Sequence, residues 1–140
     1  MANPAVVAEL LLARAALMET QGPSLAVAMP DVAFQPPVDS QGGALPYLRI
    51  DLFSNAPFWE GLASGRIDQG LLQVTVVWPE GEGIVAARRA ASDVMAHFHK
   101  GLRLFGPATR VTVNREPWVA SPIVDDSETL TPITVSWTAS

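Results

Sequence analysis

The sequence predicts an α+β fold, because two segments with helical periodicity stand among several segments that alternate in polarity. Apolar residues three and four positions apart indicate a helix, whereas apolar residues two positions apart indicate a strand with one buried face. The chain's 140 residues suit one domain with one core. We therefore expect residues 1–140 to form a single domain.

The chain opens with a predicted helix. Asn3 can cap free backbone N–H groups, and Pro4 is tolerated at the first helical position. Apolar side chains follow at helical spacing, namely Val7, Leu10, Leu11, Leu17 and Met18. Gly22 and Pro23 end the helix, because glycine adopts the left-handed conformation and proline cannot continue a helix. A short strand over residues 25–29 follows.

Residues 30–45 are rich in proline and glycine and predict an ordered loop. Pro36 and Pro37 stiffen the backbone toward polyproline II, whereas Gly42 and Gly43 leave it flexible. We expect Phe34 to pin this loop.

Two strands and a long connection form the middle of the predicted sheet. Residues 47–53 alternate, with Leu48, Ile50 and Leu52 on one face, and residues 71–78 alternate in the same way. The connection over residues 54–69 is predicted to be a loop of about sixteen residues, which is too long for an ordinary hairpin. Such a loop is either functional or partly disordered.

The second helix is predicted over residues 84–99, and Gly101 is its stop. Its apolar face consists of Ile84, Ala87, Ala91, Val94 and Phe98. Three strands are predicted after it, over residues 109–113, 118–124 and 131–138. Pro122 indicates that the middle one lies at an edge or carries a bulge, and residues 125–128 form a solvated turn.

The composition favours an oligomer. Only 16% of the residues are charged, against about 25% in an average soluble protein, while 49% are hydrophobic. A small domain cannot bury so much apolar surface internally, because its surface-to-volume ratio is high. The surplus predicts contacts between subunits, unless many of the alanines lie on exposed helix faces. The net charge of −5 argues against a dedicated binder of nucleic-acid backbones.

Neither a membrane segment nor a disulfide is expected. No run of about 18 apolar residues is present. The sequence has no cysteine, which suits a cytoplasmic origin.

One stretch matches a cofactor motif on paper. Gly81, Gly83 and Ala86 fit G-x-G-x-x-A, the dinucleotide-binding fingerprint. Glu80 and Glu82 would repel a pyrophosphate, and the ribose-binding acid due about twenty residues later is missing. We interpret the stretch as a glycine-rich helix start and expect no cofactor.

The two histidines do not predict a metal site. His97 and His99 are two positions apart on the predicted helix and point to different sides, so they cannot grip a metal together. No nucleophile elbow or phosphate-loop lysine is present. A Ser–His–Asp site assembled in three dimensions stays open, but nothing points to it. We expect no metal, no catalytic residue and no enzyme.

Three groups of residues are candidates for protein contacts. Phe58 and Trp59, with Arg66, lie in the predicted loop and are either binding anchors or folded back over the core. Arg49 and Asp51 share a strand face, which suits a charged pair at a subunit contact. A third group is a mildly basic region at Arg88, Arg89, Lys100, Arg103 and Arg110. It is either a solvated face or complements Asp125, Asp126 and Glu128 of a neighbouring subunit, which would give head-to-tail contacts.

The order of these pieces resembles the tail-terminator-like proteins of long-tailed bacteriophages, prophages and gene transfer agents. The resemblance is carried by the N-terminal helix, residues 30–37, the strand at 46–50, residues 70–76, and residues 79–83 leading into the second helix. It covers most of the chain and thins after Gly101. It implies a single mixed, mainly antiparallel β-sheet with two α-helices packed on one face.

The resemblance also implies a function. Such a protein forms a hexameric ring on the head-proximal end of the tail tube, stops tube polymerisation and joins the tail to the head connector, without catalysis. Its partners would be further copies of itself, the tail tube protein and the connector, in a virion assembled in the host cytoplasm. DNA would pass through the lumen without specific binding, which the acidic net charge suits. The rival readings are another head–tail joining or neck protein, and a small-molecule-binding α+β domain.

Overall fold

A computed structural model describes residues 2–59, 65–125 and 127–140. The helices are α1 (Pro4–Ala16) and α2 (Val85–His97), with a 3₁₀ turn η1 (Leu17–Glu19) after the first. The strands are β1 (Ala26–Ala28), β2 (Tyr47–Trp59), β3 (Arg66–Pro79), β4 (Arg103–Gly106), β5 (Thr109–Val113), β6 (Trp118–Val119), β7 (Ile123–Val124) and β8 (Glu128–Ala139). Among the described residues, no helix combines the length and apolarity needed to cross a membrane.

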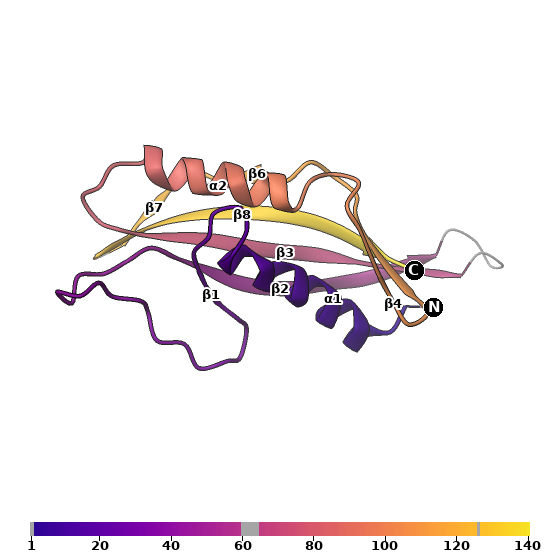
Figure 1. Ribbon diagram of the computed structural model, residues 1–140. Helices are drawn as coiled ribbons and strands as arrows, with labels where there is room; N and C mark the ends of the chain where they lie inside the picture. Colours follow the sequence, from indigo (N-terminus) through magenta and orange to yellow (C-terminus); the bar gives the residue numbers. More distant parts are fainter. Residues whose placement is uncertain (1, 60–64, 126) are drawn as a thin grey trace.

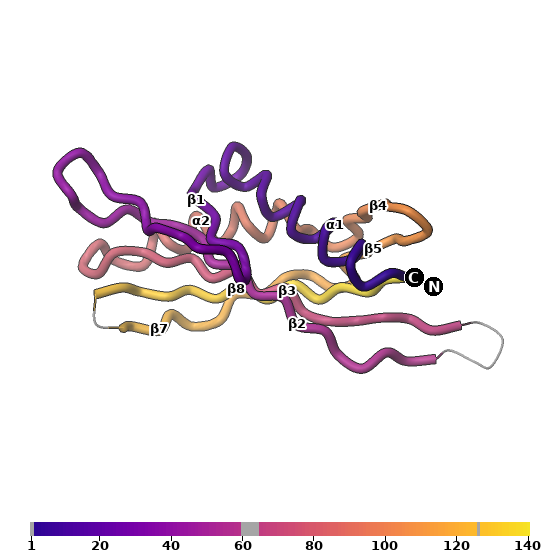
Figure 2. The backbone as a smooth tube through the Cα atoms, turned by 90° about the horizontal axis from the view of Figure 1, so that it is seen from below, coloured from indigo at the N-terminus to yellow at the C-terminus, as the bar shows by residue number. Residues whose placement is uncertain are grey.

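The strands form one mixed sheet with the order β1-β2-β3-β8-β5-β4, and β6 and β7 also pair with β8. Only β1 and β2 run parallel among the pairings of the described strands. Both helices lie on the same side of this curled sheet (Figures 1 and 2). The α+β class, the mainly antiparallel sheet and the one-sided helices are thus confirmed.

The core lies between the helices and the sheet. Val7, Leu11, Ala15 and Met18 of the N-terminal segment are buried there, as are Ala87, Ala91, Val94 and Phe98 of the α2 segment. They meet the alternate residues of the central strands, namely Leu48, Ile50, Leu72, Val74, Val76, Ile133 and Val135. Two predicted core positions are exposed: Leu17 (41%) lies in η1, whose tighter winding turns it away, and Ile84 (51%) precedes the first turn of α2.

The prediction of a loop over residues 54–69 is wrong, because most of these residues belong to β2 and β3. β2 and β3 pair from Tyr47–Val77 out to Trp59–Arg66. The register shifts between Asn55 and Phe58, which marks a β-bulge. The bulge breaks the period-two alternation, and Pro57 further disguises the strand in the sequence. Residues 60–64 of the predicted loop lie outside the described residues.

The C-terminal half differs in detail from the prediction. β7, β6 and β5 pair in turn along one side of β8. The predicted strand over 118–124 is therefore two short strands, with Pro122 in the gap where a residue without an N–H group is tolerated. Strand β4 was not predicted, because four residues are too few to show an alternation.

The loop over residues 30–45 folds against the start of β2. The rings of Phe34 and Tyr47 lie 5.0 Å apart between centroids, so Phe34 makes the kind of contact that the sequence suggests. Within the loop, Asp39 Oδ1 accepts hydrogen bonds from the backbone N–H groups of Gln41 and Gly43, at 2.8 Å each.

Candidate assembly surface

The outer part of the β2–β3 hairpin projects beyond the rest of the sheet, as Figure 2 shows. We call its described residues, 54–59 and 65–69, the arm. Toward the arm, the outermost residue of β3 that pairs with β8 is Asp68, which lies opposite Ala139. Beyond it, Arg66 and Ile67 have a strand partner only in β2. The arm therefore gains little burial from the body, and residues 54–59 are all exposed.

The bulge decides which side chains share a face of the arm. Leu48 and Ile50 face the helices, so Phe53, an odd number of positions away, lies on the opposite face, here called the outer face. Without a bulge Phe58 would point to the helix side, but the register shift places it opposite Ile67. The outer face of the arm region thus carries two apolar rungs, Phe53–Leu71 and Phe58–Ile67. Phe53 is 49% exposed and Phe58 39% exposed.

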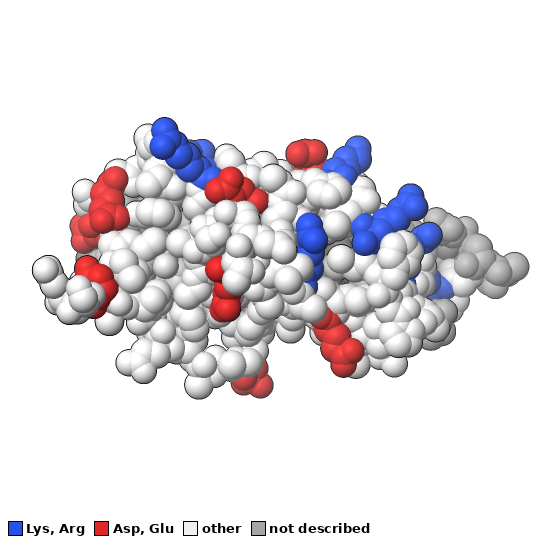
Figure 3. Space-filling view, viewed as in Figure 1, with Lys and Arg blue, Asp and Glu red and all other residues white. Residues whose placement is uncertain are grey.

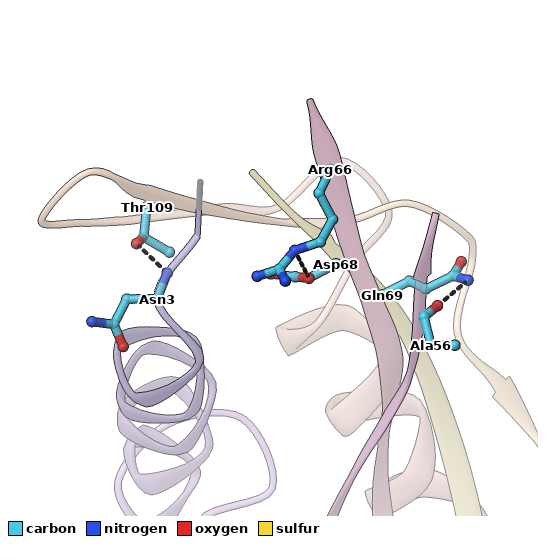
Figure 4. A network of polar contacts seen from close by, with 6 residues as sticks. All are labelled: Asn3, Ala56, Arg66, Asp68, Gln69 and Thr109. Atoms are coloured by element: carbon cyan, nitrogen blue, oxygen red, sulfur yellow. Dashed lines mark hydrogen bonds and ion pairs between the residues drawn. The ribbon is translucent and has the colours of Figure 1, made fainter. Parts of the chain in front are cut away.

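The other face of the arm is aromatic and charged. Trp59, which is 61% exposed, pairs with Arg66. Arg66 Nε lies 3.1 Å from Asp68 Oδ1, and both side chains are mostly buried. Figure 4 shows this ion pair together with the hydrogen bond from Gln69 Nε2 to the carbonyl of Ala56, 3.0 Å long. Because Ala56 lies in the bulge, this bond supplies a partner for a carbonyl in the irregular part of the strand.

The root of the arm is fixed by a close fit between a glycine and a tryptophan. Gly70 pairs with Trp137 across the sheet. A Cβ atom on Gly70 would lie 2.2 Å from the carbonyl oxygen of Phe53 and 2.4 Å from Cζ2 of Trp137. Only glycine fits there, so the buried indole can lie directly on the backbone of β3. Nothing in the local sequence around residue 70 signals this requirement, since the partner is 67 positions away in the chain.

The first turn of α1 is anchored near the arm. Asn3 caps the helix through its side-chain oxygen, which accepts a hydrogen bond from the N–H of Ala5 at 2.9 Å. The N–H of Asn3 donates to Thr109 Oγ1 at 3.2 Å (Figure 4). Between α1 and the arm root lies a pocket of about 170 Å³, lined by Pro4, Val7, Ala8, Leu52, Ser54, Asn55, Asp68, Gln69 and Trp137.

The structure brings Arg49 and Asp51 together on the outer face. Arg49 Nε lies 3.7 Å from Asp51 Oδ2, and the two side chains are 48% and 41% exposed. An ion pair this exposed contributes about 0–1 kcal/mol to stability. The pair is therefore available to a partner, and its role in a subunit contact stays a prediction.

The structure separates the predicted basic region into two parts. Arg88 and Arg89 are exposed in the first half of α2, which begins at the same end of the molecule as β7. Arg103 and Arg110 lie on β4 and β5, at the other end (Figure 1). Figure 3 shows basic residues over the β4 end and at the end where α2 begins, whereas acidic residues lie at that second end and at several places across the middle of this face. Asp125 lies in the turn after β7, and Asp126 lies outside the described residues.

The glycine-rich stretch that matches the dinucleotide-binding motif has a structural role. Gly81 and Gly83 have φ values of +89° and +79°, and they turn the chain from β3 into α2. The indole N–H of Trp78 donates to the Glu82 carboxylate. Among the described residues, no group of three His, Cys, Asp or Glu side chains is placed to hold a metal.

His97 joins the two helices. Its ring Nε2 donates to the carbonyl of Arg14 at 2.7 Å, and Arg14 Nη2 donates back to the carbonyl of His97 at 2.8 Å. The side chain is buried, and this burial lowers the pKa of His97; the hydrogen bond to the Arg14 carbonyl acts in the opposite direction, and the charge of Arg14 in the same direction. His97 is thus held neutral as a link between α1 and α2.

A folded body that extends an exposed aromatic arm is typical of proteins that assemble with other subunits. Comparison with known proteins gives the class. The family described as phage tail terminator protein matches residues 6–137, nearly the whole chain, so the chain belongs to this family. It is accordingly a structural protein of a phage tail or neck, and the family implies association with tail-tube and head components.

Solved structures share the fold. Six chains of known structure match, one of them with a TM-score of 0.80 and 24% sequence identity, covering 99% of this chain and 96% of that chain. At that identity the likeness concerns the fold alone. No curated protein matches the sequence.

Proposed function

We propose that the chain forms a ring, hexameric in the assembled tail, that caps the head-proximal end of the tail tube. There it ends polymerisation of the tube and joins the tail to the head connector, within a virion assembled in the host cytoplasm. The observation that carries the proposal is the arm, with its aromatic side chains exposed on both faces. Membership of the tail terminator family supports it.

The arm is the proposed contact with the tube or with a neighbouring subunit. Phe58, Trp59 and Arg66 occupy its distal part, where they extend beyond the sheet. Large aromatic side chains and arginine supply much of the energy of protein interfaces when a partner covers them. On an isolated chain Phe58 and Trp59 remain largely in water, so the arm is suited to binding a partner.

The body of the molecule supplies the proposed ring contacts. Large apolar side chains are exposed outside the arm as well, including Val85 at 62%, Phe105 at 69% and Val124 at 71%. Such side chains suit an obligate interface. Further candidates for subunit contacts are Arg49, Asp51, Arg88, Arg89, Asp125 and Asp126. The whole chain, residues 1–140, acts as one domain, and its acidic net charge lets DNA slide through the lumen.

The two rivals differ in what they require. A small-molecule-binding domain needs a pocket of about 300–1,000 Å³ that encloses its ligand. The pocket at the arm root measures about 170 Å³, and the larger hollow between α1 and β4, of about 440 Å³, is an open groove that does not enclose a ligand. Another neck protein would have similar surfaces but a different position. Immunogold labelling of intact virions distinguishes these, because a terminator lies where the tail tube meets the neck. Label on the capsid side of the neck, away from the tube, would contradict the proposal.

A further inference from the structure

A groove lies between α1 and β4. It measures about 440 Å³ and is lined by Leu10, Ala13, Arg14, Leu17, Arg103, Leu104 and Phe105. Its apolar side chains include Leu17 and Phe105, which are 41% and 69% exposed. The groove is therefore an apolar surface that the chain's own described residues leave in water.

The charged members of the groove are both arginines. Arg14 uses part of its guanidinium on the carbonyl of His97. Arg103 is exposed, and no ion pair to it is found among the described residues. Among the described residues, none that lines the groove is acidic. A fitting occupant is therefore apolar and negatively charged.

A surface of that kind lies at the opposite end of the molecule. We call it the β7 knob, made of Ile123, Val124, Glu128 and Glu80. Ile123 and Val124 are 56% and 71% exposed. Glu128 starts β8, directly opposite the end of β3, and the N–H of Glu80 donates to the carbonyl of Ser127 at 3.0 Å. The knob thus combines two exposed aliphatic residues with two acidic residues at one end of the sheet.

The knob and the groove of one chain cannot meet. Strand β8 runs from Thr129, which pairs with Val124 of the knob, to Ala139, which pairs with Val111 beside β4. An extended strand rises about 3.3 Å per residue, so the two ends lie on the order of 30 Å apart. Figure 1 shows β7 and β4 at opposite ends of the sheet. The two complementary surfaces can therefore pair only between copies.

We infer that the β7 knob of one copy seats in the α1–β4 groove of the next. Two different patches then form each contact, which makes it a head-to-tail contact, and such contacts close into a ring when the rotation between copies permits. The inference rests on the proposed ring and specifies its interface. It leaves the arm free for the tail tube.

Cysteine cross-linking tests the inference without background, because the sequence has no cysteine. Val124→Cys and Phe105→Cys place one thiol on the knob and one at the groove, both at well-exposed positions. The two variants, mixed and treated with a short bismaleimide, should give covalent dimers, whereas each variant alone should stay uncross-linked. The double variant should give a ladder that ends at the ring size.

A matched control is Val32→Cys, which is 62% exposed in the loop before β2 and outside both surfaces. Mixed with Phe105→Cys, it should give no dimer. Light scattering of the wild-type protein, alone and on purified tails, shows separately whether rings form. Rings without the mixed cross-link would overturn the inference and leave the proposed function standing. Dimers of Val124→Cys alone, or cross-links to the tube protein, would likewise overturn it. No ring under either condition would overturn both.

Discussion

Truncating the aromatic pair at the end of β2 should separate folding from function. Phe58→Ala with Trp59→Ala removes side chains that are 39% and 61% exposed. Full burial of such a side chain contributes about 1.5–3 kcal/mol, so their buried fractions contribute about 1–2 kcal/mol each at most. A domain stable by about 5–15 kcal/mol survives that loss. By contrast, Trp137 is 3% exposed, and Trp137→Ala should lower the free energy of unfolding by about 3–5 kcal/mol.

The functional loss should be much larger than the loss of stability. Interface anchors of this type contribute about 2 kcal/mol or more, or about thirtyfold in affinity for each side chain. Circular dichroism and urea denaturation measure folding, and complementation of a gene deletion measures attachment of heads to tails. Trp118→Ala, which is 45% exposed away from the arm, is the matched control and should complement normally. An unfolded double variant, or a folded one that attaches tails as the wild type does, would refute the reasoning.

Three further predictions concern the arm root and the helix link. Gly70→Ala should destabilise the chain by about 3 kcal/mol or more, because its Cβ would collide with backbone and with a buried indole. The control Gly81→Ala introduces only backbone strain and should destabilise the chain by about 1–2 kcal/mol. Equal urea midpoints for the two variants would contradict the close fit of Trp137 on Gly70. Inserting one alanine between Pro57 and Phe58 should shift the outer part of β2 by one register position, so that Phe58 lies opposite Arg66 instead of Ile67 and on the other face. The protein should fold, as judged by circular dichroism, yet fail to attach tails; normal plaque formation would count against the arm's faces mattering. Because burial lowers the pKa of His97 below the ordinary 6.5, the folded state binds this proton more weakly than the unfolded state. Its contribution to stability is therefore full above pH 6.5 and is lost as the pH falls below it; urea midpoints at pH 7.5 and pH 5 should show a drop that His97→Gln reduces and His99→Gln leaves in place.

Local patterns were sufficient to predict most of the body. Capping by Asn3 and the spacing of Val7, Leu11 and Met18 are short-range signals, and they gave the first helix correctly. The alternation at 47–53 and 71–78 gave the two central strands, because one face of each is buried against the helices. The interpretation of Gly81 and Gly83 as a helix start agrees with their positive φ values.

The arm could not be predicted in the same way. A bulge adds one residue and reverses the alternation, so Phe58 and Trp59 read as loop although they lie in a strand. Exposure on both faces removes the apolar pattern that marks a strand with one buried side. The close fit of Trp137 on Gly70 and the groove beside Arg103 depend on residues distant in the chain. Residue type alone marks Phe58, Trp59 and Arg66 as contact candidates, whereas their place on the arm depends on the bulge and on the pairing with β3.

The length of the tails tests the central claim most directly. In a phage that lacks this gene, electron microscopy should show tails of abnormal and variable length without attached heads, because nothing stops addition of tube subunits. Supplying the wild-type gene in trans should restore a single tail length. Headless tails of normal, uniform length in the deletion would contradict the account and assign the protein to another part of the neck.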